Sequence, residues 1–268
     1  MSVNGRIVGR IEFLEAEAGA RVRPRGTLVL LHAFPLSARM WEPQFTFADR
    51  GWRIIAPDFA RSAAAPSANV TMDTYAGVVI DLLDSLHIED AVLGGCSMGG
   101  YLAFALFRRA PHYVRGLILA DTRAQADAPE ALENRKKMLQ LVADKGTPAV
   151  VADMVPKLLG ETTKTTRPEV VEKVESIALA TPAETVAGMI RALMTRQDSM
   201  ALLSAIRLPT LIVVGEEDTL TPPAMSEQMH KAIAGSELAI LPKAGHLPNL
   251  EDSQRFNETL ARFLEHRI

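Results

Sequence analysis

The sequence predicts an α/β protein: an open, mostly parallel, doubly wound sheet with a helical insertion between two of its strands. Three features of the 268 residues support this fold class. Short apolar runs rich in Val, Leu and Ile recur along the chain, and helical patterns lie between them. One stretch of about 80 residues contains helical patterns without a convincing strand. Strands that are apolar on both faces are typical of a parallel sheet covered by helices on both sides.

The expected elements follow one another in a regular order. Residues 6–17 can form an antiparallel hairpin at one edge of the sheet. Six apolar runs are expected to be its parallel strands: 27–31, 53–56, 91–93, 116–120, 210–214 and 238–241. Helices are expected between and after them, at 71–86, 98–109, 222–234 and 248–267.

The strandless stretch predicts how the chain divides into domains. We expect residues 1–123 and 207–268 to form an α/β core and residues 124–206 to form a helical cap, or lid. Signals for helix starts in the cap are three prolines and one pair with capping-box spacing: Pro148, Pro168 and Pro182, and Thr181 with Glu184. A helical insertion between two strands of one sheet is expected to cover a functional site.

Composition and charge exclude several classes of protein. Apolar residues make up 48% and charged residues 23%, enough apolar side chains for a sizeable core. With 29 basic and 32 acidic residues, the chain has no basic footprint for nucleic acid and no polybasic run for an anionic membrane. The single cysteine, Cys96, excludes a disulfide within the chain and a cysteine-rich metal site. Cys96 itself is expected to be an inert apolar filler.

The longest uncharged window is too short for a membrane span. It covers residues 91–107, and four glycines interrupt its 17 residues. The N-terminal residues lack the apolar stretch of a signal peptide. We therefore expect a cytoplasmic monomer or homodimer that has neither a nucleic acid nor a membrane as partner.

The uncharged window contains a candidate nucleophile. Residues 95–99 read Gly-Cys-Ser-Met-Gly and match G-x-S-x-G, directly after an expected strand and at the start of an expected helix. This is the context of a nucleophile elbow, whose sharp turn exposes the Ser97 hydroxyl and needs nearly side-chain-free neighbours at Gly95 and Gly99. A chance serine between glycines is the alternative.

A serine hydroxyl needs a base, and the base needs an acid to orient it. His246 lies after the last expected strand and before the last expected helix, whereas four other histidines lie in or beside helical patterns: His87, His112, His230 and His266. Asp218 follows the strand at 210–214. Asp121, at the end of the strand at 116–120, is a rival for the role of the acid. Glu216 and Glu217 are expected to be solvated loop charges.

Taken together, the motifs resemble those of the α/β-hydrolase fold superfamily of serine hydrolases. They are HAFP at 32–35, APD at 56–58, GGCSMGG at 94–100, LADTRA at 119–124, GEEDTLTPP at 215–223 and AGHLPNLE at 244–251. The resemblance is strongest to small carboxylesterases and 3-oxoadipate enol-lactonase-like hydrolases. It implies the triad Ser97, Asp218 and His246, in the order along the chain that is common in this fold.

The resemblance also implies an oxyanion hole. The backbone amides of Met98 and Phe34 are expected to bind the oxyanion, and His32 becomes a structural loop histidine. Ala33 stands where the family usually has glycine, so a positive φ there would be strained. The loop Phe59-Ala60-Arg61-Ser62 looks shorter than its counterpart in the family.

The expected function is hydrolysis of carboxylic esters through an acyl-enzyme, without a metal or an organic cofactor. An apolar pocket for short to medium acyl chains is expected from five residues: Leu36, Met138, Met154, Met189 and Leu247. Arg123 can steer an anionic substrate, although an exposed arginine is the default interpretation. Three alternatives stay open: a lactonase with the same triad, a non-hydrolytic receptor or sensor with this fold, and haloperoxidase or perhydrolase activity.

Overall fold

Eight strands form one sheet in the order β1-β2-β4-β3-β5-β6-β7-β8. The computed structural model describes residues 3–18, 22–61 and 69–268. Ser62, the last residue of the loop that looked shortened, lies outside these ranges. The strands are β1 (Asn4–Val8), β2 (Ile11–Ala16), β3 (Gly26–Leu31), β4 (Trp52–Asp58), β5 (Ala91–Cys96), β6 (Val114–Ala120), β7 (Thr210–Gly215) and β8 (Glu237–Leu241).

The sheet is antiparallel only at its N-terminal edge. The pairs β1–β2 and β2–β4 are antiparallel, and all other neighbouring strands are parallel, as the sequence predicts. The strand order reverses at β3, which pairs with β4 on one side and β5 on the other. Ligands of open α/β sheets bind at the carboxyl ends of strands at such a switch point. The loop after β3 and the turn after β5 meet there.

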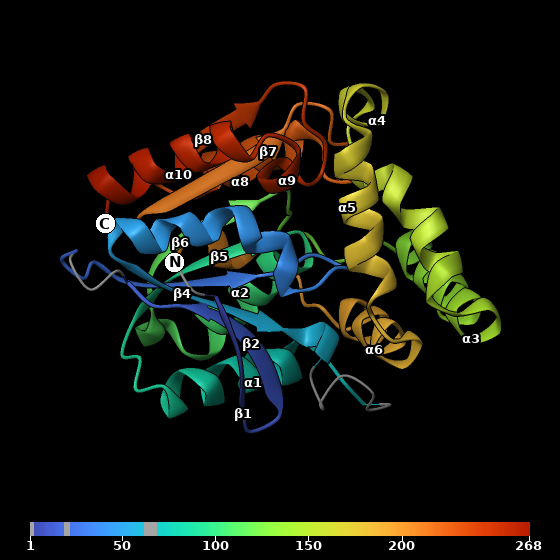
Figure 1. Cartoon of the computed structure of the whole chain (residues 1–268), viewed down its shortest axis with the longest axis horizontal. Helices are drawn as coiled ribbons and strands as arrows, with labels where there is room; N and C mark the ends of the chain where they lie inside the picture. Colours follow the sequence, from blue (N-terminus) through green and yellow to red (C-terminus); the bar gives the residue numbers. More distant parts are fainter. Residues whose placement is uncertain (1–2, 19–21, 62–68) are drawn as a thin grey trace.

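Helices cover both faces of the sheet (Figure 1). One core cluster contains residues of α1 (Met72–Ser85), α2 (Met98–Arg109) and α8 (Pro223–Ala232). The second cluster contains residues of η1 (Ala38–Arg50), α9 (Pro248–Glu251) and α10 (Ser253–His266), where η1 is a run of 3₁₀ turns. Two short 3₁₀ segments lie between these elements: η2 (Phe59–Arg61) and η3 (Pro111–Tyr113).

The last expected helix is divided in two. A side-chain oxygen of Asp252 accepts a hydrogen bond from the Arg255 amide and caps the start of α10, so α9 ends one residue earlier. The segment η1 was not expected, because Pro43 inside it is unfavourable for an α-helix. The other helices and the six parallel strands lie within a few residues of their predicted positions.

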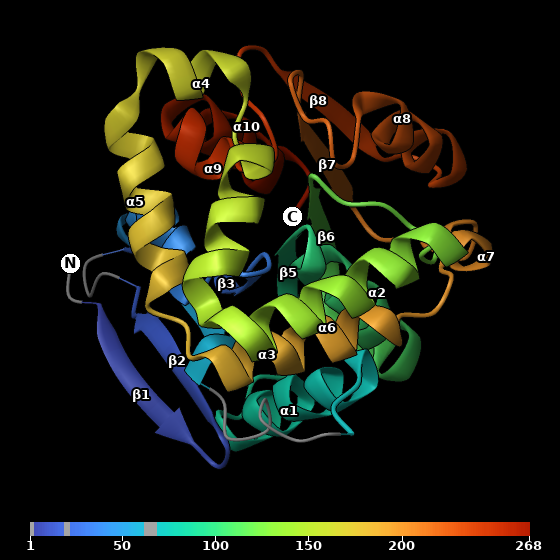
Figure 2. The same cartoon turned by 90° about the vertical axis from the view of Figure 1, so that its right-hand side faces the viewer.

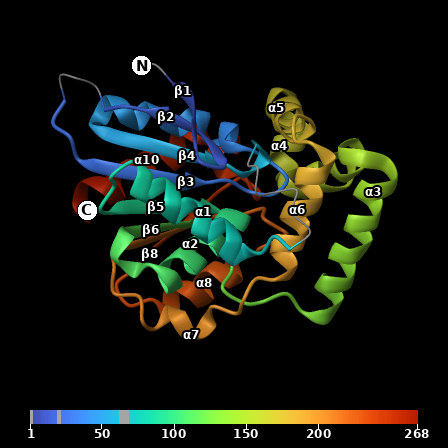
Figure 3. The ribbon, with the colours of Figure 1, turned by 90° about the horizontal axis from the view of Figure 1, so that it is seen from below.

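Helices alone fill the chain between β6 and β7. They are α3 (Pro129–Leu158), α4 (Glu161–Thr166), α5 (Pro168–Leu179), α6 (Ala183–Met194) and α7 (Met200–Leu203). Helices α3 to α6 gather at one end of the sheet, away from the C-terminus (Figures 1 and 3). Figure 2 looks onto this end and shows α3 and α5 in front of the strands. That residues 124–206 form a separate domain stays a prediction.

The predicted helix starts in this cap are only partly correct. Gly146, with φ of 71°, interrupts α3 just before Pro148, and Pro168 is the first residue of α5. The predicted capping box is wrong, because α6 begins at Ala183 without a side-chain cap. The Thr181 hydroxyl instead donates a hydrogen bond to the Pro35 carbonyl oxygen and so ties the cap to the loop after β3.

Among the helices of the described ranges, none is by itself long and apolar enough to cross a bilayer. Helices α5 and α6 reach that length and composition only as a pair, and they are bent by 94° relative to each other.

Candidate active site

Ser97 lies on a sharp turn between β5 and α2. Its φ of 52° and ψ of −110° are rarely adopted by residues with a side chain, which is the backbone strain of a nucleophile elbow. The two flanking glycines are required sterically. A Cβ on Gly95 would overlap the Gly99 carbonyl, and a Cβ on Gly99 would overlap the carbonyl oxygen of Leu31.

Asp218 and His246 form a buried hydrogen-bonded pair. The distance between His246 Nδ1 and Asp218 Oδ2 is 2.8 Å. The amides of Leu220 and Thr221 donate to Asp218 Oδ1, and the Thr221 hydroxyl donates to Oδ2 at 2.6 Å. Burial raises the pKa of Asp218, but His246 and Thr221 outweigh burial and lower this pKa to about 2. The carboxylate is therefore ionised and held in place to orient the imidazole.

Asp121, the rival acid, lies beside this pair in a different state. Asp121 Oδ1 accepts a hydrogen bond from the Gly215 amide at 2.8 Å, and Asp121 is fully buried. Burial and the neighbouring Asp218 charge raise the pKa of Asp121 well above its ordinary value. The raised pKa of Asp121 means that a second negative charge beside the ionised Asp218 is disfavoured.

These three side chains are also the candidate metal ligands of the described ranges. One oxygen or nitrogen atom of each of Asp121, Asp218 and His246 lies within 4.8 Å of the others. The imidazole nitrogen that faces the carboxylates is already hydrogen-bonded to Asp218. The geometry fits an oriented acid–base pair better than a cation site.

Glu251 holds the loop that carries His246. Its Oε1 accepts hydrogen bonds from the Gly245 and Leu247 amides, and its Oε2 accepts one from the Gly160 amide of the cap. The His246 amide donates to the Leu158 carbonyl at the end of α3. The cap and the histidine loop are therefore joined through their backbones. The motif at 244–251 includes Glu251, but nothing in the sequence indicates this role.

The loop after β3 is held by His32. His32 Nε2 accepts a hydrogen bond from the Phe59 amide at 3.0 Å, and burial lowers the pKa of His32. Ala33 does not adopt a positive φ, so the expected strain is absent at this residue. Phe34 and Met98, the expected oxyanion-hole residues, both line the cavity in which Ser97 and His246 lie.

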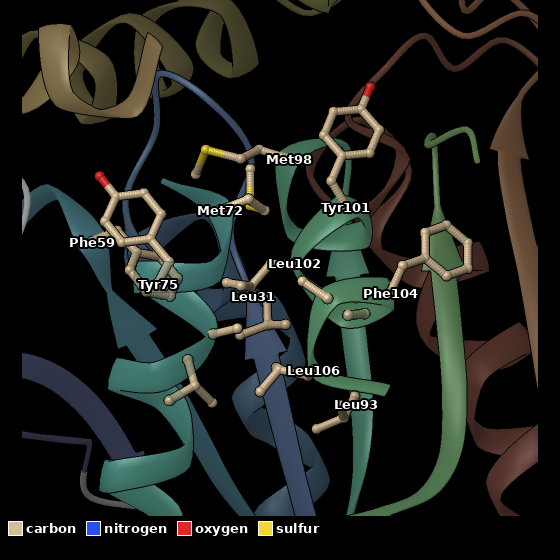
Figure 4. Close-up of a cluster of buried hydrophobic side chains, with 14 of the residues drawn as sticks. Leu31, Phe59, Met72, Tyr75, Leu93, Met98, Tyr101, Leu102, Phe104 and Leu106 are labelled. Carbon is tan, nitrogen blue, oxygen red and sulfur yellow. The ribbon is translucent and has the colours of Figure 1, made fainter. Parts of the chain in front are cut away.

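This cavity has a volume of about 240 Å³ and lies between the core and the cap. Met138 and Met154 line it. Leu36, Met189 and Leu247 do not line it and instead pack inside the two core clusters. Figure 4 shows Met98 and Tyr101 at the cap end of the apolar cluster under α2.

Charged residues line one part of the cavity, and of these the sequence analysis considered only Arg123. Arg123, Asp127, Arg135 and Lys157 contribute to its wall. The interpretation of Arg123 as an exposed arginine is wrong, since its side chain is 21% exposed and paired with Asp127. One signal in the sequence could have placed Arg123 at the cavity: it follows β6, the strand next to the one that ends just before Ser97.

Two further residues have defined surroundings. Cys96 is fully buried, and burial raises the pKa of its thiol well above the ordinary value, as suits an unreactive filler. Glu217 is not a solvated loop charge, because its carboxylate accepts hydrogen bonds from the amide and hydroxyl of Thr162 in α4. Glu216 is exposed.

The fold and the site agree with the comparison against known protein families. The sequence profile of the alpha/beta hydrolase fold matches residues 26–253. The chain belongs to the α/β-hydrolase fold family, and its relatives include esterases and enol-lactonases.

Three relatives illustrate the range of enzymes to which the chain is similar. A solved thermophilic esterase from Thermogutta terrifontis, with malate bound, is 35% identical, with a TM-score of 0.89, covering 99% of this chain and 98% of that one. 3-Oxoadipate enol-lactonase 2 from Acinetobacter baylyi is 27% identical over 238 residues, or 88% of this chain and 87% of that protein. Pimeloyl-(acyl-carrier protein) methyl ester esterase from Neisseria meningitidis is 25% identical over 260 residues, or 88% of this chain and 92% of that protein.

Proposed function

We propose that this protein is a serine hydrolase that cleaves carboxylic esters with short to medium acyl chains. One observation carries the proposal: Ser97, on a strained turn, faces the same cavity as His246, whose other side is hydrogen-bonded to the ionised Asp218. The cavity of about 240 Å³ is below the range of about 300–1,000 Å³ common for drug-sized ligands, which favours small substrates.

In the proposed mechanism, the carbonyl carbon is attacked by the Ser97 hydroxyl oxygen while His246 takes the hydroxyl proton. Asp218 keeps the imidazole in the required tautomer and stabilises the imidazolium. The amides of Phe34 and Met98 bind the oxyanion. His246 then gives its proton to the departing alcohol. Water, activated by His246, hydrolyses the acyl-enzyme and releases the acid.

Replacing the nucleophile tests this proposal. With 4-nitrophenyl butyrate, Ser97→Ala should lower kcat by a factor on the order of 10⁴ or more, because the substitution removes the proposed nucleophile. The exposed Ser85→Ala is the matched control and should keep full activity. Full activity in Ser97→Ala would reject the mechanism. Tight binding without turnover of any ester or lactone would favour a receptor or sensor.

A lactonase is the second candidate. The relative from Acinetobacter baylyi is named an enol-lactonase, and the same triad opens a lactone ring by attack on its ester carbonyl. Product-resolved assays of esters and lactones in parallel separate the two activities. A kcat/KM that is higher for lactones than for all esters tested would make ring opening the main reaction.

A further inference from the structure

Three arginines surround one buried carboxylate beside the cavity. Arg123 Nη2 and Arg196 Nη2 both donate to Asp127 Oδ1 at 2.6 Å, and Arg135 Nε donates to Oδ2 at 2.6 Å. Burial raises the pKa of Asp127, but Arg135 and Arg196 lower this pKa to about 2. Asp127 is thus ionised, and the guanidinium groups stay charged. We call these four residues the arginine cluster, and it carries two positive charges in excess.

The arginine cluster lies next to the nucleophile turn. The hydroxyl of Thr122, which precedes Arg123, donates to the Ser97 carbonyl oxygen at 2.9 Å. The Arg196 guanidinium lies over the ring of Tyr101, 4.0 Å from its centroid, and Tyr101 is one helical turn after Ser97. Arg123, Arg135 and Asp127 line the same cavity as Ser97.

A purely structural role does not account for all three arginines. One arginine would neutralise Asp127, yet three share it, and burying unbalanced charge is costly. Arg123 Nε has no hydrogen-bond partner within the described ranges, and the Arg123 and Arg135 side chains are 21% and 19% exposed at the cavity. Lys157 also lines the cavity, but its ammonium is paired with Asp153 at 2.7 Å and adds no unpaired charge. Asp73 and Arg108 line a smaller cavity behind the cluster. Their opposite charges cancel, so they do not balance the excess positive charge of the cluster.

We propose that the arginine cluster selects ester substrates that carry a second, anionic group, a carboxylate, which Arg123 and Arg135 bind. Guanidinium groups bind carboxylates with strong, charge-assisted hydrogen bonds, and a cleft with low-dielectric walls concentrates anions. The small cavity limits the chain between the ester and the carboxylate to a few carbon atoms. This inference rests on the proposed ester hydrolysis, and its test separates the two.

Two pairs of esters of similar shape place the charge on opposite sides of the scissile bond. On the acyl side, mono-4-nitrophenyl glutarate is compared with 4-nitrophenyl 5-methylhexanoate, in which an isopropyl group replaces the carboxylate. On the alcohol side, 4-acetoxybenzoate is compared with 4-isopropylphenyl acetate. The wild-type protein should have a kcat/KM at least tenfold higher for the anionic member of one pair.

Variants then assign the preference to the cluster. Arg123→Met should lower the anionic-to-neutral ratio of kcat/KM by at least tenfold, and Arg123→Lys, which keeps the charge, should restore part of it. In both variants Asp127 still pairs with Arg135 and Arg196. Lys137→Met, an exposed position on the same helix as Arg135, removes the same charge as a control and should leave the ratio unchanged.

A binding measurement makes the inference independent of turnover. Calorimetric titration with glutarate should show binding to wild type and to Ser97→Ala, and at least tenfold weaker binding to Arg123→Met. A preference for the neutral ester in both pairs, or an unchanged ratio in Arg123→Met, would overturn the inference. Glutarate binding without any hydrolysis that depends on Ser97 would instead reject the proposed function and keep the anion site.

Discussion

At the scale of single residues, two carboxyl groups beside one imidazole have opposite pKa shifts. The pKa of Asp218 is lowered to about 2, whereas burial and the Asp218 charge raise the pKa of Asp121. Such divergence is typical of acids with different roles in one site. In its protonated form, Asp121 can donate a hydrogen bond to Asp218 and stabilise the charge that orients His246.

This difference predicts unequal effects of the same substitution. Asp218→Asn should lower kcat/KM for 4-nitrophenyl butyrate on the order of 10⁴-fold, because the amide cannot hold the required tautomer of His246. Asp121→Asn should lower it less than tenfold, because an amide is neutral and can donate the same hydrogen bond. Steady-state kinetics of both variants give the comparison. A larger loss in Asp121→Asn would transfer the role of the acid to Asp121.

At the scale of elements, the sequence was most informative where a candidate site residue lies at the end of a strand. Ser97, Asp218 and His246 each follow an apolar run and precede a helix, so local patterns place them at one edge of a parallel sheet. The pairing of Asp218 with His246 depends on two loops 28 residues apart, and it could be predicted only through the order along the chain.

The cavity wall was predicted less well, for a physical reason. Met138 and Met189 both lie on the apolar side of a cap helix, but α6 packs on the core while α3 spans the cavity. Helical periodicity identifies the face that avoids water and does not say whether a neighbouring helix or a substrate covers it. The arginine cluster joins three separate segments, so no local pattern reveals it.

The loop between β8 and α9 depends on one residue outside the proposed triad. Three backbone amides donate to the Glu251 carboxylate, two beside His246 and one in the cap. Glu251→Gln turns one acceptor oxygen into an amide group that faces N–H donors. Its kcat should fall about tenfold with little change in KM, because the loop that positions His246 loosens.

The control for this prediction is Glu258→Gln, on the exposed face of α10. Kinetics are measured at a temperature at which both variants stay folded, as checked by circular dichroism. A positioning role also predicts slower labelling of Ser97 by a fluorophosphonate in Glu251→Gln. Unchanged kcat and unchanged labelling would contradict it.

At the scale of the whole molecule, carboxylates with lowered pKa values join separate parts of the chain. Asp127 pairs with Arg123 at the end of a core segment and with Arg135 and Arg196 in the cap, and Asp218 links two loops of the site. Glu15 pairs with Arg6 and Arg53 across the N-terminal edge of the sheet. Burial raises the pKa of Glu15, but the two arginines outweigh burial and lower this pKa. All three groups bind protons more readily in the unfolded chain.

The free energy of unfolding should therefore decrease as the pH falls. A lowered folded-state pKa stabilises the protein above the unfolded-state value of about 3.9 for Asp, and this contribution is lost as the pH approaches the folded-state value. With pKa values of about 2, Asp127 and Asp218 should each lose about 1 kcal/mol between pH 6 and pH 3. Asp121, with its raised pKa, acts in the opposite direction.

Urea unfolding at pH 6 and pH 3, followed by the fluorescence of the buried Trp41 and Trp52, measures this loss. Asp127→Asn should be less stable than wild type at pH 6, since three arginines lose their shared partner, but its stability should fall less steeply, by about 1 kcal/mol over the interval. Asp218→Asn tests the second group in the same way. Asp81→Asn, at an exposed position of α1, should keep the wild-type pH dependence. An equally steep loss in Asp127→Asn would mean that acid destabilises the molecule at sites other than the junction between cap and core.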